Sequence, residues 1–334
     1  MALLLRAVRQ PLATVVSVVG SMVGSIIGRS RAWLLPSRTM RRRLWPPALG
    51  LLYIAVIGVL GGLHGGHVLI GLLGFLDAYN EKTRLFLRTF LPCIVTGAIY
   101  DSLRYTLVPG TAGRIHVAGP YLLERAWFGI GGRTLNEVFE VHHWAIADVA
   151  AGLAYLFYVA EFLGLAMLVF FTGNVARALT FARCFFAVSM MGFITYFIYP
   201  AAPPWYVAAR GLGPAQMNIE PSPGAAHRFD ALLGTHIFTN VYSQSVEVFG
   251  AIPSLHVAYP LMAAVLAFQT RELRWARWPA AFFAVLICFS AVYLQHHYVI
   301  DVLIGLGYAA IVVAAVPAWE RRHAATARCR CQCP

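Results

Sequence analysis

Residues 298–318 read YVIDVLIGLGYAAIVVAAVPA, and Asp301 is the only charged residue among them. About 20 mainly apolar residues in an α-helix span the hydrocarbon core of a bilayer, so this stretch is long enough to cross a membrane. Similar apolar segments precede it, at about 47–63, 67–78, 85–108, 146–171, 178–200, 254–270 and 279–296. Together they predict an all-α protein, a multi-pass transmembrane helical bundle.

The composition of the chain agrees with a membrane protein. Of its 334 residues, 59% are hydrophobic and only 12% are charged, whereas soluble domains carry about 25% charged residues. These values exclude a soluble enzyme, a disordered chain and a collagen. The net charge of +12 would suggest nucleic acid binding in a soluble protein. Cytoplasmic loops of membrane proteins also collect Arg and Lys, so no nucleic-acid partner is expected.

The basic residues predict an orientation in the membrane. When the segments are threaded with alternate ends on one side, that side collects the basic clusters, which are Arg41–Arg43, Lys82/Arg84, Arg177, Arg271/Arg274/Arg277 and Arg321/Arg322. The positive-inside rule makes that side cytoplasmic. The two long polar interruptions, 109–145 and 201–253, and the His296-His297 turn are then expected on the extracytoplasmic side.

Three ionisable residues fall at the predicted extracytoplasmic ends of helices: His256, His297 and Asp301. His256 closes the segment GAIPSLH, where Pro253 and Ser254 mark a helix start. His297 and Asp301 are four residues apart and share one helix face, so the carboxylate can accept the Nδ1–H of the imidazole and leave Nε2 as a nucleophile. Ionisable residues in membrane segments are generally functional, which favours a reaction centre over structural histidines.

These residues also carry a family resemblance. PSLH, ending at His256, and HHYVIDV, starting at His296, resemble the second and third signature motifs of the type 2 phosphatidic acid phosphatase superfamily. The segments PAAPPWY (200–206), RFD (228–230) and VFGAIPSLH (248–256) further resemble the branch that contains fungal inositol phosphorylceramide synthase. The resemblance covers about residues 140–318 and is loose in the N-terminal third. It implies a six-helix phosphatidic-acid-phosphatase-like catalytic core.

The resemblance implies a phosphohistidine mechanism. Carried over by position, His297 attacks phosphorus, Asp301 orients and stabilises His297, and His256 protonates the departing alcohol and deprotonates the incoming one. Water as the acceptor makes a phosphatase, and a lipid alcohol makes a transferase. The branch implies transfer of phosphoinositol from phosphatidylinositol to ceramide within the lipid bilayer, with release of diacylglycerol and with no cofactor or metal.

Three departures from the family pattern favour a phosphodiester substrate. Superfamily phosphatases usually carry a Lys and an Arg in a first motif and an Arg six residues before the nucleophile. By spacing, these positions fall on Thr195, Ala202 and Ala291, so all three cations are missing. A phosphomonoester dianion needs this neutralisation in a site of low dielectric, whereas a diester carries one charge and needs less.

Polar residues near the motifs are the candidates for substrate binding. Arg228 and Arg210, in the 201–253 loop, are expected to bind the phosphoryl oxygens, with solvated loop arginines as the alternative. Asp230 is a candidate for hydrogen bonds with inositol hydroxyls or for pairing with Arg228. Asp148, which matches an Asp of the same branch, is expected to line the headgroup cavity or to form a structural pair. Ser254 completes the set.

The sequence therefore predicts five regions: an N-terminal interfacial helix and basic segment (1–45), N-terminal transmembrane helices (46–108), an extracytoplasmic loop (109–145), a catalytic membrane core (146–318, with the loop 201–253) and a cytoplasmic tail (319–334). A spanning segment is the alternative for residues 12–27. The tail ends in CRCQCP and is expected to be a plain basic tail rather than an acylation or metal site. A lipid phosphate phosphatase, a transferase of another headgroup, and a transporter or scaffold remain alternatives for the whole protein.

Overall fold

The computed structural model describes residues 45–59, 65–111, 113–243 and 248–332. The predicted interfacial helix at 12–27 and the cluster Arg41–Arg43 lie outside the described residues, as do the cysteine side chains of the CRCQCP tail. Within the described ranges the regular elements are helices, and the β-pairing consists of isolated bridges. The all-α prediction is therefore confirmed.

The described residues form two compact units. The first comprises the described residues up to Leu91 together with Leu168–Val175. It contains α2 (Trp45–Val59), α3 (Gly65–Tyr79) and the start of α4 (Glu81–Thr111). Small residues allow α2 and α3 to approach closely, because a Cβ at Gly50 would lie 1.9 Å from the carbonyl oxygen of Gly71. Such contacts are common between membrane helices.

The second unit comprises Pro92–Met167 and the described residues from Ala176 onward. Its helices include α5 (Ala118–Phe128), α6 (Leu135–Val141), α7 (Ala145–Phe171), α8 (Val175–Ile198), α9 (Pro204–Arg210), α10 (His227–Leu233), α11 (Ile237–Ser243), α12 (Leu255–Phe268), α13 (Arg277–Tyr293) and α14 (Val299–Gln332). Among the described helices, α7, α8 and α14 are long and apolar enough to cross a membrane, while α2, α3, α12 and α13 are shorter apolar helices. Each predicted apolar segment thus falls mainly within a described helix, but α4, which contains 85–108, is not among the described helices that qualify as spans.

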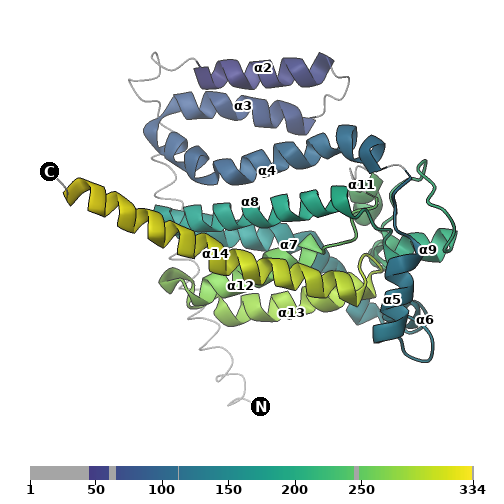
Figure 1. The fold of residues 1–334 in the computed structure, drawn as a ribbon. Coiled ribbons are helices and arrows are strands. Elements are labelled where there is room, and N and C mark those ends of the chain that lie inside the picture. The colour runs from purple at the N-terminus through teal and green to yellow at the C-terminus, as the bar shows by residue number, and fades with distance from the viewer. Residues whose placement is uncertain (1–44, 60–64, 112, 244–247, 333–334) are drawn as a thin grey trace, which may run out of the picture. The chain divides into compact units, whose positions relative to one another are not determined.

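The two motif-bearing helices, α12 and α14, pack against each other, and α12 also packs against α13 (Figure 1). Their crossing requires a glycine, because a Cβ at Gly305 would lie 2.3 Å from the carbonyl oxygen of Ser254. One backbone hydrogen bond joins the starts of the two helices, from Ser254 N–H to Asp301 C=O at 3.0 Å. The first turns of α12 and α14 are therefore held side by side.

Basic residues gather at the other end of these helices. Arg177 Nε, near the start of α8, donates to Thr270 Oγ1 after α12 at 2.9 Å. Arg183 of α8 forms an ion pair with Glu320 of α14 at 2.6 Å. Figure 1 shows α5, α6 and α9 at the opposite end, where α14 begins. This separation agrees with the predicted grouping of basic residues on one side, and the cytoplasmic assignment of that side remains a prediction.

The predicted loop 109–145 contains α5 and α6, which fix the start of α14. Glu124 of α5 is fully buried, and its carboxylate accepts hydrogen bonds from the N–H groups of Val299 at 3.1 Å and Ile300 at 3.2 Å. These N–H groups belong to the first turn of α14, which leaves its donors without helical partners. Burial raises the pKa of Glu124, and the two backbone donors oppose that rise. The sequence carries no sign of this role for Glu124, because its partners are distant in the chain.

We expect Glu124→Ala to destabilise the protein by about 1–3 kcal/mol, because two partly buried N–H groups lose their acceptor. Glu124→Gln retains one acceptor oxygen and should fall between the Ala variant and the wild type. The measurement is thermal unfolding in detergent micelles. Glu220→Ala, in an exposed part of the 201–253 loop, is the control and should leave Tm unchanged. An Ala variant as stable as the wild type would show that this contact does not hold α14.

Candidate active site

The structure brings the three predicted reaction-centre residues together. Nδ1 of His256, in the first turn of α12, lies 3.0 Å from Nε2 of His297, in the turn between α13 and α14. His297 and Asp301 are buried, and His256 is half-buried. Two segments far apart in the chain thus present facing imidazole rings.

The hydrogen bonds assign the tautomer of His297. Its Nδ1 lies 2.9 Å from the carbonyl oxygen of Ala251, which can only accept, so Nδ1 carries the hydrogen. Nε2 therefore carries the lone pair and accepts from His256 Nδ1–H. The unprotonated nitrogen of His297 therefore faces His256 directly.

Asp301 lies beside His297 but in a different role from the one expected. Its Oδ2 is 3.7 Å from His297 Nδ1, beyond hydrogen-bond distance, and accepts instead from Tyr298 N–H at 2.8 Å. The Nδ1–H donates to the carbonyl of Ala251, which the Ser254–Asp301 backbone bond holds close. The expectation that Asp301 accepts this hydrogen is therefore wrong in this structure. At 3.7 Å, the carboxylate of Asp301 is still close enough to interact electrostatically with the imidazole.

Tyrosines from α7 and α11 stack against the histidine rings. The ring of His256 stacks on Tyr155 at a centroid distance of 4.3 Å and lies 4.5 Å from Tyr158. His296 stacks between Tyr155, at 5.0 Å, and Tyr242, at 4.6 Å. The three-residue spacing of Tyr155 and Tyr158 was the sequence signal for this aromatic face, and it was missed.

Arg228 and Asp148 pair with each other. Arg228 Nε donates to Asp148 Oδ1 at 2.8 Å, and an Nη donates to the carbonyl oxygen of Tyr293 at 3.2 Å. The guanidinium lies 4.9 Å from the centroid of the Tyr293 ring, whose hydroxyl also donates to Asp148 at 2.9 Å. Glu140 lies 3.5 Å from the other Nη. Asp148 was expected either to line the headgroup cavity or to form a structural pair, and its contacts with Arg228 and Tyr293 are those of a structural pair.

Asp230 holds the start of α11. Its carboxylate accepts hydrogen bonds from the Thr235 hydroxyl at 3.0 Å, the Phe238 N–H at 3.2 Å, and both the N–H and hydroxyl of Thr239 at 3.0 and 3.1 Å. Burial opposes ionisation, but these four donors outweigh it and lower the pKa of Asp230. The described structure contains no ion pair between Asp230 and Arg228.

Arg210 and Ser254 have contrasting positions. Arg210 is exposed at the end of α9. Ser254 is fully buried at the start of α12, and its hydroxyl has no hydrogen-bond partner among the described residues. Ser254 is therefore buried two residues before His256, whereas Arg210 lies at the surface.

Uncharged residues occupy the three positions where superfamily phosphatases usually carry cations, and these residues are packed or hydrogen-bonded within the protein. Ala202 and Ala291 are fully buried among apolar side chains. The Thr195 hydroxyl is engaged with the carbonyl oxygen of Met191 and the hydroxyl of Tyr308. Apolar packing at Ala202 and Ala291 leaves no space for the long cationic side chains of superfamily phosphatases. Among the described residues, no group of three or more His, Cys, Asp or Glu side chains is arranged to hold a metal ion.

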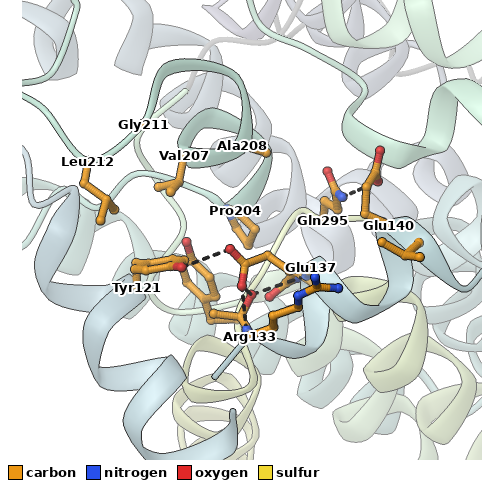
Figure 2. A pocket seen from close by; sticks show the side chains of 14 residues that line it. Tyr121, Arg133, Glu137, Glu140, Pro204, Val207, Ala208, Gly211, Leu212 and Gln295 are labelled. Atoms are coloured by element: carbon orange, nitrogen blue, oxygen red, sulfur yellow. Dashed lines mark hydrogen bonds between the residues drawn. The ribbon is translucent and has the colours of Figure 1, made fainter. Parts of the chain in front are cut away.

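A cavity of about 510 Å³ adjoins the turn that carries His297. It is lined by residues of α5, α6 and α9 and by Gln295 and Tyr298, which flank the two histidines (Figure 2). The cavity could not be read from the sequence, because its walls come from both long polar interruptions and from the His297 turn.

Comparison with known proteins assigns these motifs to a family. The family model described as PAP2 superfamily matches residues 121–315. A phosphoinositol dihydroceramide synthase from Bacteroides thetaiotaomicron is 36% identical over 270 residues, which cover 77% of this chain and 86% of the relative. No solved structure matches the chain.

Two fungal proteins are similar over a shorter range. The inositol phosphorylceramide synthase catalytic subunit of Schizosaccharomyces pombe is 31% identical over 182 residues, which cover 54% of this chain and 42% of the relative. The corresponding subunit of Saccharomyces cerevisiae is 31% identical over 179 residues, covering 52% and 43%. The match therefore spans less than half of each fungal protein and most of the bacterial one.

The Arg228–Asp148 pair makes a prediction about stability. Arg228→Met leaves a buried carboxylate without its cation and should cost about 3–5 kcal/mol, whereas removing both charges from a buried pair is often nearly neutral. We therefore expect Arg228→Met combined with Asp148→Leu to be more stable than Arg228→Met alone. A double-mutant cycle in thermal unfolding measures this coupling. Strictly additive losses would mean that the pair contributes nothing.

Proposed function

This chain belongs to the PAP2 superfamily, and on that premise we propose that it is an integral membrane phosphotransferase that moves phosphoinositol from phosphatidylinositol to ceramide or dihydroceramide and releases diacylglycerol. The bacterial relative named for this product supports the proposal over most of the chain. The observation that carries it is the 3.0 Å contact between the facing histidines, beside packed positions that carry no cation.

The facing rings suit an in-line displacement at phosphorus. In the proposed first half, the donor's phosphodiester separates the rings and His297 Nε2 attacks phosphorus. A P–N bond forms as the P–O bond to diacylglycerol breaks, and His256, entering as an imidazolium, gives its Nδ1 proton to the departing oxygen. Asp301, 3.7 Å from Nδ1, offsets the positive charge that develops on His297.

The second half reverses these steps with a new alcohol. The primary hydroxyl of the acceptor gives its proton to His256 Nδ1 and attacks phosphorus, and the P–N bond breaks to return the lone pair to His297. His256 is again an imidazolium, so the cycle balances protons without metal or cofactor.

Charge favours a diester over a monoester in this site. Ala202 and Ala291 stand where superfamily phosphatases usually carry cations, and both are buried in apolar packing. A monoester dianion would enter a poorly neutralised site, whereas a diester brings a single negative charge. This difference disfavours the alternative of a lipid phosphate phosphatase. We also propose that the reaction takes place on the extracytoplasmic side, because the basic residues gather at the other end of the helices.

We expect His297→Ala to lower transfer by at least about 10³-fold, because the nucleophile is lost. Purified protein in micelles receives phosphatidylinositol with fluorescent ceramide or dihydroceramide, and lipid products and inorganic phosphate are both measured. His236→Ala, an exposed histidine of the 201–253 loop, is the matched control and should retain full activity.

Each other outcome of this assay has a distinct meaning. Undiminished transfer by His297→Ala would rule out the proposed nucleophile. Release of phosphate or inositol phosphate with ceramide unchanged would make water the acceptor and the protein a hydrolase. With phosphate-labelled donor and no acceptor, the wild type should hold acid-labile label, and His297→Ala should hold none.

A further inference from the structure

We propose that Tyr155 and Tyr158 stabilise the positive charge that His256 carries during the reaction, in the place that a carboxylate would otherwise take. This inference rests on the proposed function and adds two positioning residues that act through His256. Both tyrosines belong to α7 and lie outside the two signature motifs.

The two facing histidines differ in how a charge on each ring can be balanced. The carboxylate of Asp301 lies 3.7 Å from Nδ1 of His297, close enough to interact with charge on that ring. Among the residues that the structure describes, no carboxylate lies within ion-pair distance of His256. His256 is half-buried, so water shields it only in part. A charge in such a place is costly unless another group stabilises it.

Two aromatic rings lie against His256 where a carboxylate is missing. The imidazole is nearly parallel to the ring of Tyr155, with an interplanar angle of 16° and a centroid distance of 4.3 Å. The ring of Tyr158 lies 4.5 Å away at 41°. The face of an aromatic ring carries partial negative charge and attracts a cation within about 6 Å of its centroid, more strongly where water is excluded. Both rings therefore stabilise an imidazolium at His256 without an ion pair.

The protein core holds both tyrosines in place. Tyr155 is 3% exposed and belongs to the apolar cluster that includes residues of α12 and α13, and Tyr158 packs against the same cluster. Tyr158 also stacks with Tyr259 at 6.1 Å, and the Tyr259 hydroxyl is hydrogen-bonded with Ser189 at 2.9 Å. The two aromatic faces are thus fixed before charge develops on His256, which is the arrangement that stabilises a transition state most effectively.

The charge on His256 changes in both halves of the proposed reaction. In the first half, stabilising the imidazolium keeps a proton on the ring for the departing alcohol. In the second half, positive charge grows on His256 as it takes the proton of the acceptor hydroxyl, so the same stabilisation makes it a stronger base. A carboxylate could also do this, but its negative charge would repel the phosphate of the substrate. Uncharged aromatic rings avoid that repulsion.

The test places phenylalanine and its mono-, di- and trifluorinated analogues at position 155. Tyr155→Phe removes a hydroxyl that has no hydrogen-bond partner among the described residues and keeps the aromatic face, so transfer should stay within about threefold of wild type. Fluorine withdraws electron density from the face while the ring keeps nearly the same shape. From phenylalanine to the trifluorinated analogue, kcat should fall stepwise by about 3- to 10-fold in all, with the KM for ceramide within about twofold.

Phe162 provides the matched control. It is fully buried about two turns further along α7, and its ring contacts among the described residues are with aromatic side chains of α8 and α12. The same fluorinated residues at position 162 should leave kcat unchanged. A fall of equal size at positions 155 and 162 would show that fluorination acts through packing and would overturn the inference.

A donor with a better leaving group isolates the step in which His256 acts as a base. In nitrophenyl phosphoinositol the departing nitrophenolate needs no proton, so its release in the first turnover should be equally fast in wild type and in the trifluorinated variant. Transfer of the bound phosphoinositol to ceramide should be slower in the variant by about 3- to 10-fold. A slower first release with unchanged transfer to ceramide would contradict the inference.

These measurements separate the inference from the proposed function. If wild type is active and every fluorinated variant transfers as fast as Tyr155→Phe, the inference is wrong and the transferase proposal is unaffected. If wild type neither transfers phosphoinositol nor releases nitrophenolate, the proposed function is wrong and the inference falls with it.

Discussion

The approach of α12 to α14 is the constraint on which the candidate site depends. The helices cross where Gly305 meets the carbonyl of Ser254, and the backbone bond from Ser254 to Asp301 fixes their register. His256 is the second residue of α12 and His297 lies two residues before α14, so this register sets the 3.0 Å distance between the two rings. Membrane helices associate through close packing of small residues, and here such a contact also builds the reaction geometry.

The charged side chains around the site are already paired with other groups of the protein before a substrate binds. Arg228 is held by Asp148, Glu140 and the carbonyl of Tyr293, and Asp230 is occupied by donors at the start of α11. Of the three positions where superfamily phosphatases usually carry cations, two are buried alanines and the third, Thr195, is hydrogen-bonded within the protein. A substrate with one negative charge therefore meets a site with little uncompensated charge, which is the electrostatic condition suited to moving a diester between two lipids.

Features that depend on local sequence spacing could be predicted from the sequence. Contacts between residues far apart in the chain could not. His297 and Asp301 are four residues apart in the chain, and the apolar segments are long, so both features could be read directly. The Arg228–Asp148 pair joins residues 80 apart, and Glu124 meets α14 across 175 positions. The acceptor for His297 Nδ1–H is the backbone carbonyl of Ala251 rather than Asp301. This contact could not be predicted, because a pattern of side chains does not show where backbone carbonyls lie.

The contact between the two histidines also has a consequence for the enzyme at rest. In the proposed mechanism, the Nε2 lone pair of His297 accepts a hydrogen bond from His256 Nδ1–H until a bound substrate separates the two rings. A water molecule can enter a membrane site, but its few contacts supply little binding free energy to break that hydrogen bond. A lipid diester contacts the protein along its whole length and supplies more. The nucleophile is thus shielded between turnovers, which favours an exchange between lipids over wasteful cleavage.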